Sequence, residues 1–223
     1  MTNVTDFPRR RAPRGRLALL PIFAGLFVLW FVLQGASRLF TDYLFFDELD
    51  FTRVFRTVAG SQILLVVVFG VGFFALLWGN LVLADRMAPA YRPLGPGDEL
   101  VARYREIVGT NGNRLRLILA AAFALVAGFG ASGQWEHWLL FRHGGSFGAK
   151  DPLTGILFGR DVGFYVFKLP FLQFLVGWAF TAVLVTAVLT TVAHYLNGGI
   201  RLAPTALDRV TPQVRSHLSL LFA

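Results

Sequence analysis

Residues 61–84 read SQILLVVVFGVGFFALLWGNLVLA and contain no formally charged side chain. A helix needs about 20 consecutive apolar residues to cross the hydrocarbon core of a bilayer. Three further apolar stretches occupy residues 17–37, 115–133 and 169–196, and the only formally charged side chain in them is Arg116. A water-soluble protein of 223 residues has no use for four such stretches. The sequence therefore predicts an all-α, polytopic transmembrane helix bundle with four complete spans, the first of them over residues 17–38.

The composition also indicates a membrane protein. Hydrophobic residues make up 55% of the chain, charged residues make up 15%, and the mean hydropathy is +0.59. Soluble domains carry about 25% charged residues. A net charge of +8 would suggest nucleic-acid binding in a soluble protein. Here the basic residues flank the apolar stretches, so the expected partner is a lipid bilayer and no nucleic acid. The absence of cysteine excludes disulfides, thiol catalysis and thiolate metal sites.

The positions of the basic residues predict an orientation. Residues 1–16, 85–116 and 197–216 hold 14 of the 21 basic residues, and residues 38–60 and 134–168 hold the other 7. Cytoplasmic segments of membrane proteins carry such an excess, which predicts a multi-pass plasma-membrane protein with a cytoplasmic N-terminus. The arginines on that side are expected to contact anionic lipid headgroups. A cleavable signal peptide is the alternative, but its apolar segment would be only about 7–15 residues long.

The segments outside the spans have their own expected structures. Residues 1–16 are predicted to form a disordered, basic cytoplasmic arm. External loops are expected at about residues 39–60 and 134–168, and cytoplasmic loops at about residues 85–114 and 197–216.

Two of these segments carry a helical or apolar pattern. Residues 40–58 place apolar side chains on one side, which predicts a helix lying in the membrane interface, with a loop packed on the bundle as the alternative. From His217 the chain turns apolar again. That change predicts the start of a truncated fifth span, and makes a missing C-terminal part of the same chain an expected partner.

Small residues and helix signals predict how the later spans are built. Ala124, Gly128 and Ser132 are four positions apart, a spacing that lets helix backbones approach closely. The third span is therefore expected in the middle of the bundle. The fourth span is expected to begin at Leu169, next to a proline, and to stop at the Asn-Gly-Gly run of residues 197–199.

The second external loop holds charged residues with two interpretations. Asp151 precedes a proline and is expected to start a turn. Asp161 is placed to N-cap a short helix that carries aromatic residues into the interface. The alternative is a functional external patch that these two carboxylates form with Lys150 and Arg160.

The same loop resembles a known family. Residues 147–152 read FGAKDP, residues 159–171 read GRDVGFYVFKLPF, and residues 41–49 of the first loop read TDYLFFDEL. These runs resemble the uncharacterised bacterial membrane family UPF0182, found widely in actinobacteria. The resemblance implies a much longer protein, with further membrane spans followed by a large extracytoplasmic region. It implies no biochemical activity, because none is established for the family.

The spans themselves offer little chemistry. Ionisable residues at the membrane midplane mark proton relays and ion paths, and the four spans contain no formally charged residue apart from Arg38 and Arg116 at their ends. Their most polar members are Gln34, Asn80, Gln173 and His194, all toward span ends. A proton-coupled site built from these helices alone is therefore not expected.

The second external loop also holds residues that could form a metal site. Glu136, His137 and His143 are residue types that ligate zinc. Residues 136 and 137 would point apart on a helix, so interfacial polar residues are the preferred interpretation and zinc is the alternative. The sequence predicts no catalytic, cofactor-binding or metal-binding residue and no enzyme. The expected function is a membrane-anchoring module for a large extracytoplasmic region, and the alternative is part of a transporter or lipid-handling complex.

Overall fold

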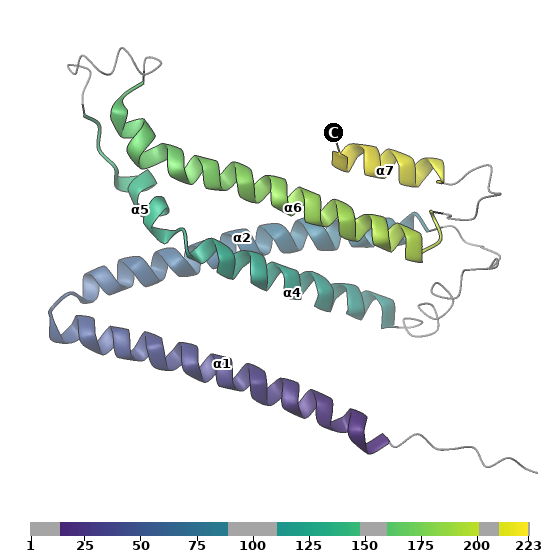
Figure 1. Ribbon diagram of the computed structural model, residues 1–223, viewed down its shortest axis with the longest axis horizontal. Coiled ribbons are helices and arrows are strands. Elements are labelled where there is room, and N and C mark those ends of the chain that lie inside the picture. The colour runs from purple at the N-terminus through teal and green to yellow at the C-terminus, as the bar shows by residue number, and fades with distance from the viewer. Residues whose placement is uncertain (1–13, 89–110, 148–159, 201–209, 223) are drawn as a thin grey trace, which may run out of the picture. The chain divides into compact units, whose positions relative to one another are not determined.

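The computed structural model describes residues 14–88, 111–147, 160–200 and 210–222. Its helices, shown in Figure 1, are α1 (Arg14–Glu48), α2 (Thr52–Arg86), α4 (Gly112–Ser132), α5 (Trp135–His143), α6 (Leu169–Leu196) and α7 (Pro212–Phe222). A π-helical turn, η2 (Phe164–Lys168), leads directly into α6. The described residues contain no strand beyond one isolated bridge between Ile200 and Val210. The predicted all-α class is confirmed for this part of the chain.

Three helices among the described residues are long and apolar enough to cross a membrane. They cover Thr52–Arg86, Gly112–Ser132 and Phe164–Leu196, and contain the predicted second and fourth spans and all but the last residue of the third. The predicted first span lies within α1. Four complete spans therefore remain a prediction, of which three meet the requirements of length and composition.

Parts of several predictions lie outside the described residues. They are the disorder of residues 1–13, most of the cytoplasmic loop at 89–110, and the patch that includes Lys150 and Asp151. The described part of the N-terminal arm, residues 14–16, is already helical.

The chain forms two compact units, Met1–Thr57 and Val58–Ala223. In the first unit, α1 continues through residues 38–48, where no glycine or proline interrupts it. The single interfacial helix predicted over residues 40–58 is therefore wrong, because α1 and α2 each extend into this segment and meet at a tight turn.

That turn is a Schellman motif, in which two backbone N–H groups beyond a helix end bond carbonyls of its last turn. The N–H of Asp50 donates to the carbonyl of Asp47 at 3.1 Å, and the N–H of Phe51 donates to that of Phe46 at 2.8 Å. Asp50 has a φ of 57°, a left-handed conformation that aspartate tolerates better than most residues. The ring of Phe46 also contacts that of Phe55, across the turn.

In the second unit, one stripe of α2 makes most of the core. Its buried residues are nearly all four positions apart: Ser61, Leu65, Phe69, Phe73, Leu77, Leu81 and Ala84. The large side chains of the stripe pack against small residues of the neighbouring helices, Ala120 and Ala124 of α4 and Ala182 of α6. Side chains four apart form a ridge along a helix, and small residues opposite provide the groove.

The closest approach of α2 and α4 lies at two glycines. A Cβ at Gly128 would lie 2.6 Å from the carbonyl oxygen of Val66 and 3.2 Å from the Cα of Gly70. The predicted small-residue contact is therefore confirmed at Ala124 and Gly128, both of which are buried. The opposite face of α4 is open, since Val126 is 73% exposed, so within this unit α4 is covered on one side.

At the other end of this unit, α5 and η2 pack on the start of α6. The rings of Trp138 and Phe141 contact Phe171 with centroids 5.3 and 5.2 Å apart. The carboxylate of Asp161 accepts a 2.6 Å bond from the N–H of Gly163, which confirms the predicted N-cap. The helix it caps runs without a break into α6, so the fourth helical segment begins before the predicted Leu169.

Candidate functional site

The end of α6 turns the chain so that α7 packs beside it (Figure 1). The N–H of Gly198 donates to the carbonyl of Tyr195 at 3.0 Å, and that of Gly199 donates to the carbonyl of His194 at 2.8 Å. Gly198 takes a φ of 86°, which a residue without a Cβ adopts at no cost. These bonds form a second Schellman motif, and they confirm the predicted stop at residues 197–199.

Gly199, the next residue of the turn, must also lack a side chain, but for a different reason. A Cβ at Gly199 would lie 2.6 Å from Cγ2 of Val214, a fully buried side chain of α7. The N–H of Thr211 donates to the carbonyl of Gly199 at 3.2 Å. The absence of a side chain at position 199 therefore lets α7 lie directly against the end of α6.

This packing buries two histidines against each other. His194 of α6 is 1% exposed and His217 of α7 is 4% exposed. Nε2 of His194 lies 2.9 Å from Nδ1 of His217, and the two rings are nearly perpendicular. Nε2 of His217 lies 2.9 Å from Oδ1 of Asn80 on α2. A chain of hydrogen bonds thus joins α6, α7 and α2.

The amide of Asn80 sets the direction of this chain. Its Nδ2 donates to the carbonyl of Leu76 at 2.7 Å, so its Oδ1 is the atom that faces His217. An amide oxygen only accepts, and His217 must therefore carry its proton on Nε2. In the neutral ring Nδ1 is then an acceptor, and His194 must donate from its own Nε2. Both imidazoles are neutral Nε2–H tautomers in this arrangement.

Burial also affects the charge that His217 can hold. Desolvation lowers the pKa of His217 below its ordinary value of 6.5, because an imidazolium loses its hydration in the packed site. No carboxylate among the described residues is hydrogen-bonded to either ring. The site therefore favours two neutral imidazoles.

The buried face of α6 continues the polar character of the site. Thr186 and Thr190 lie eight and four positions before His194, on the same face, and both are fully buried. Neither hydroxyl has a hydrogen-bond partner among the described residues. In contrast, Thr191 on α6 donates to the carbonyl four residues earlier. Nearly all buried polar groups in proteins are hydrogen-bonded, so these two hydroxyls mark a place for water or another polar group.

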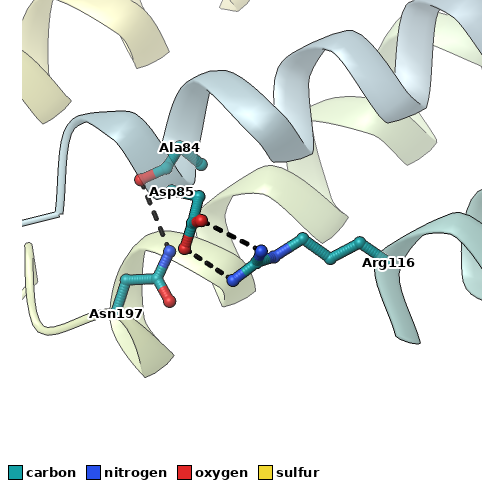
Figure 2. A network of polar contacts seen from close by, with 4 residues as sticks. All are labelled: Ala84, Asp85, Arg116 and Asn197. Carbon is teal, nitrogen blue, oxygen red and sulfur yellow. Dashed lines mark hydrogen bonds and ion pairs between the residues drawn. The ribbon is translucent and has the colours of Figure 1, made fainter. Parts of the chain in front are cut away.

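A second polar cluster joins the ends of α2 and α4 and the residue that follows α6 (Figure 2). The guanidinium of Arg116, at the start of α4, forms two bonds of 3.0 and 2.5 Å with the carboxylate of Asp85, near the end of α2. Nδ2 of Asn197 donates to the carbonyl of Ala84 at 3.4 Å. The last carbonyls of a helix lack intrahelical donors, and Asn197 supplies one across to α2.

The structure thus brings together some of the residues named from the sequence. Asn80 and His194 belong to one chain of bonds, whereas Gln173 is exposed and Gln34 lies in the first unit. Their partner His217 was expected only as the start of a fifth span. It lies inside α7, which begins at residue 212, and the fifth span itself stays a prediction. Asn80 and His217 are 137 positions apart in the sequence, so no local pattern indicates their contact.

The two histidines of the alternative zinc site have separate partners. Nδ1 of His137 lies 2.7 Å from Oε1 of Gln134, and Nδ1 of His143 lies 3.2 Å from the carbonyl of Leu139. The described residues gather no group of three or more metal-ligating side chains. The guanidinium of Arg160, part of the proposed external patch, lies over the ring of Phe164.

These features define a class, a multi-helix protein with helices of membrane-spanning length and a polar junction at one end of its bundle. The sequence comparisons identify the family. The chain belongs to the uncharacterised protein family UPF0182, whose model matches residues 19–223.

The relatives come from actinobacteria. A UPF0182 protein of Salinispora arenicola is 39% identical over 96% of this chain and 21% of its own length. One from Frankia casuarinae is 40% identical over 91% of this chain and 19% of its own length. One from Mycobacterium bovis is 39% identical over 83% of this chain and 18% of its own length. The chain therefore spans about a fifth of the relatives it matches. No solved structure matches it.

Proposed function

We propose that this chain is a membrane-embedded helical module that anchors a larger UPF0182 protein in the plasma membrane, with a large extracytoplasmic region attached. The observation that carries the proposal is the open apolar surface of the three long helices. Only 33%, 22% and 17% of their most apolar 18-residue windows are buried. Water does not tolerate so much contiguous apolar surface, whereas lipid does.

The arrangement of the helix ends supports a multi-pass topology with a cytoplasmic N-terminus. Asp85, Arg116 and Asn197 come from the two predicted cytoplasmic loops or their borders, and they meet at one end of the second unit (Figure 2). Helices that cross a bilayer in succession bring alternate connections to the same side. The excess of arginine near this end favours the cytoplasmic side by the positive-inside rule.

Cysteine labelling tests this topology, since the chain has no cysteine of its own. We expect Ser146→Cys and Asp47→Cys, both at exposed positions, to react with a membrane-impermeant maleimide on intact cells. Arg114→Cys, exposed at the start of α4, should react only after the cells are permeabilised. The inverse labelling pattern would overturn the orientation.

The alternative function, part of a transporter or lipid-handling complex, is favoured by one observation. The buried face of α6 carries Thr186, Thr190 and His194, and the two threonine hydroxyls have no hydrogen-bond partner in the part of the chain that the structure describes. Polar groups inside a membrane helix bundle often mark a path for an ion or substrate. In this alternative, helices of the longer protein complete a polar path along α6.

A further inference from the structure

We propose that the buried His194–His217 pair is a binding site for a single proton, and that an occupied site loosens the docking of α7 on α6. The proposal does not depend on the anchoring function or on the orientation in the membrane. It rests on the 2.9 Å contact between the rings, the assigned tautomers and the burial of both side chains.

The hydrogen-bond chain has room for one added proton. In the neutral pair, Nε2 of each ring carries a proton and Nδ1 of His217 accepts, so Nδ1 of His194 is the remaining basic nitrogen. A proton bound there turns His194 into an imidazolium that still donates to His217. The bridging proton can then move, as the Nε2–H bond of His194 breaks and an Nδ1–H bond forms on His217. A second proton would remove the acceptor and break the contact.

Proton transfer along this chain of hydrogen bonds stops at Asn80, so the site stores a proton and does not pass it on. The amide oxygen of Asn80 accepts the Nε2–H of His217 but does not take up its proton at ordinary pH. The open nitrogen lies at the junction with α7, because a Cβ at Gly199 would be 3.8 Å from Nδ1 of His194. In this proposal the proton reaches the pair from the glycine turn at residues 198–199.

Among the described residues, the added charge has no compensating partner in the docked arrangement. Facing the pair are Asn80 from α2 and the two rings themselves, while Arg215 of α7 is exposed. From α4, Arg116 is held by Asp85, and no carboxylate among the described residues bonds either ring. The C-terminal end of α6 favours a cation and offsets part of the cost. A buried charge without a counter-ion still favours the state in which water reaches it, which is the undocked α7.

The first test examines the pair in the unmodified full chain, in nanodiscs. With only four histidines in the chain, ¹⁵N spectra of the imidazoles can be assigned individually. At pH 8 we expect His194 and His217 as Nε2–H tautomers, with a ¹⁵N–¹⁵N coupling across the N–H···N bond. The coupling should disappear as the pH is lowered to 5. Absence of the coupling at pH 8, or its persistence unchanged at pH 5, would overturn the proposal.

The second test measures the docking of α7 directly. Spin labels at Leu220→Cys on α7 and Leu125→Cys on α4, both exposed, report the distance between these helices. We expect a narrow distance distribution at pH 8 that broadens toward pH 5, with the docking equilibrium falling by up to about tenfold per pH unit because one proton is bound.

Matched variants separate this site from a general effect of acid. His143→Gln, at an exposed position in α5, should keep the pH dependence of the distance. The double variant His194→Gln/His217→Gln should lose it. If the double variant does not dock α7 at any pH, the pH dependence of the ¹⁵N–¹⁵N coupling in the unmodified chain alone tests the proposal. A pH response that survives in a docked double variant would contradict the proposal.

Discussion

Asn80 shows how one neutral side chain fixes the protonation of two others. Its Nδ2 is committed to the carbonyl of Leu76, and its Oδ1 therefore faces His217. The sequence identified Asn80 and His194 as polar residues near helix ends, which the structure bears out. Their contact through His217 could not be predicted from the sequence, because residue spacing carries no information on a contact made by a separate helix.

Substitution of Asn80 should change the response to pH in a defined direction. Asn80→Asp places a carboxylate against Nε2 of His217 and should raise the pKa of His217, since an opposite charge favours the imidazolium. The stabilisation by this pair is then present at low pH and is lost as the pH rises through the raised pKa. In the unmodified chain, where the pKa of His217 is lowered, stabilisation is present above about 6.5 and lost below it. Titration of the His217 imidazole, followed by NMR in the variant and in the unmodified chain, measures the direction of the pKa shift in each.

A control variant separates charge from the loss of a bond. Asn80→Leu leaves the Nε2–H of His217 without an acceptor, which should cost about 1–3 kcal/mol in the docking of α7 at every pH. Equal titration curves for His217 in Asn80→Asp and in the unmodified chain would show that Asn80 does not face the ring.

At the scale of the helices, backbone proximity governs the contact of α2 with α4. The small-residue spacing in the third span predicted this contact, because small side chains are what close packing requires. The partner Gly70 and the exact crossing point depend on the fold of α2. The interfacial helix over 40–58 failed for a different reason. An amphipathic pattern does not show whether a helix is separate or continues a neighbouring one, and the left-handed Asp50 gave no glycine signal for the turn.

A pair of glycine variants tests the packing of α2 and α4. Gly128→Ala should destabilise the helix contact by about 1–3 kcal/mol, because the added methyl would overlap the carbonyl oxygen of Val66. Gly130→Ala is the matched control, since nothing lies within 4 Å of a Cβ there. It should be neutral or slightly stabilising, as alanine favours helix. Thermal unfolding in detergent micelles, followed by circular dichroism, measures both. Equal midpoints for the two variants would contradict this account of the contact.

At the scale of the whole molecule, apolar surface dominates. The sequence predicted the helical class and the positions of the long helices well, because charge-free stretches of membrane length have few other uses. It did not predict α7 as a helix docked on α6 from residue 212, since residues 197–216 read as a polar loop.

Extraction experiments test the dominance of that surface. Val176 and Phe180 on α6 are 72% and 70% exposed, and Val126 on α4 is 73% exposed. We expect the chain to stay in the membrane pellet after an alkaline carbonate wash, which removes peripheral proteins. Recovery of folded, monomeric chain in the supernatant without detergent would contradict an embedded module.

The π-helical turn before α6 changes which residues of this segment share a face with α6. The N–H of Leu169 bonds the carbonyl of Phe164, five residues back, so this turn contains one residue more than an α-helical turn. A wheel drawn in α-helical phase from α6 backward therefore assigns Phe164 and Tyr165 the wrong azimuth. Deleting one residue from this turn would rotate Phe164 and Tyr165 relative to α6.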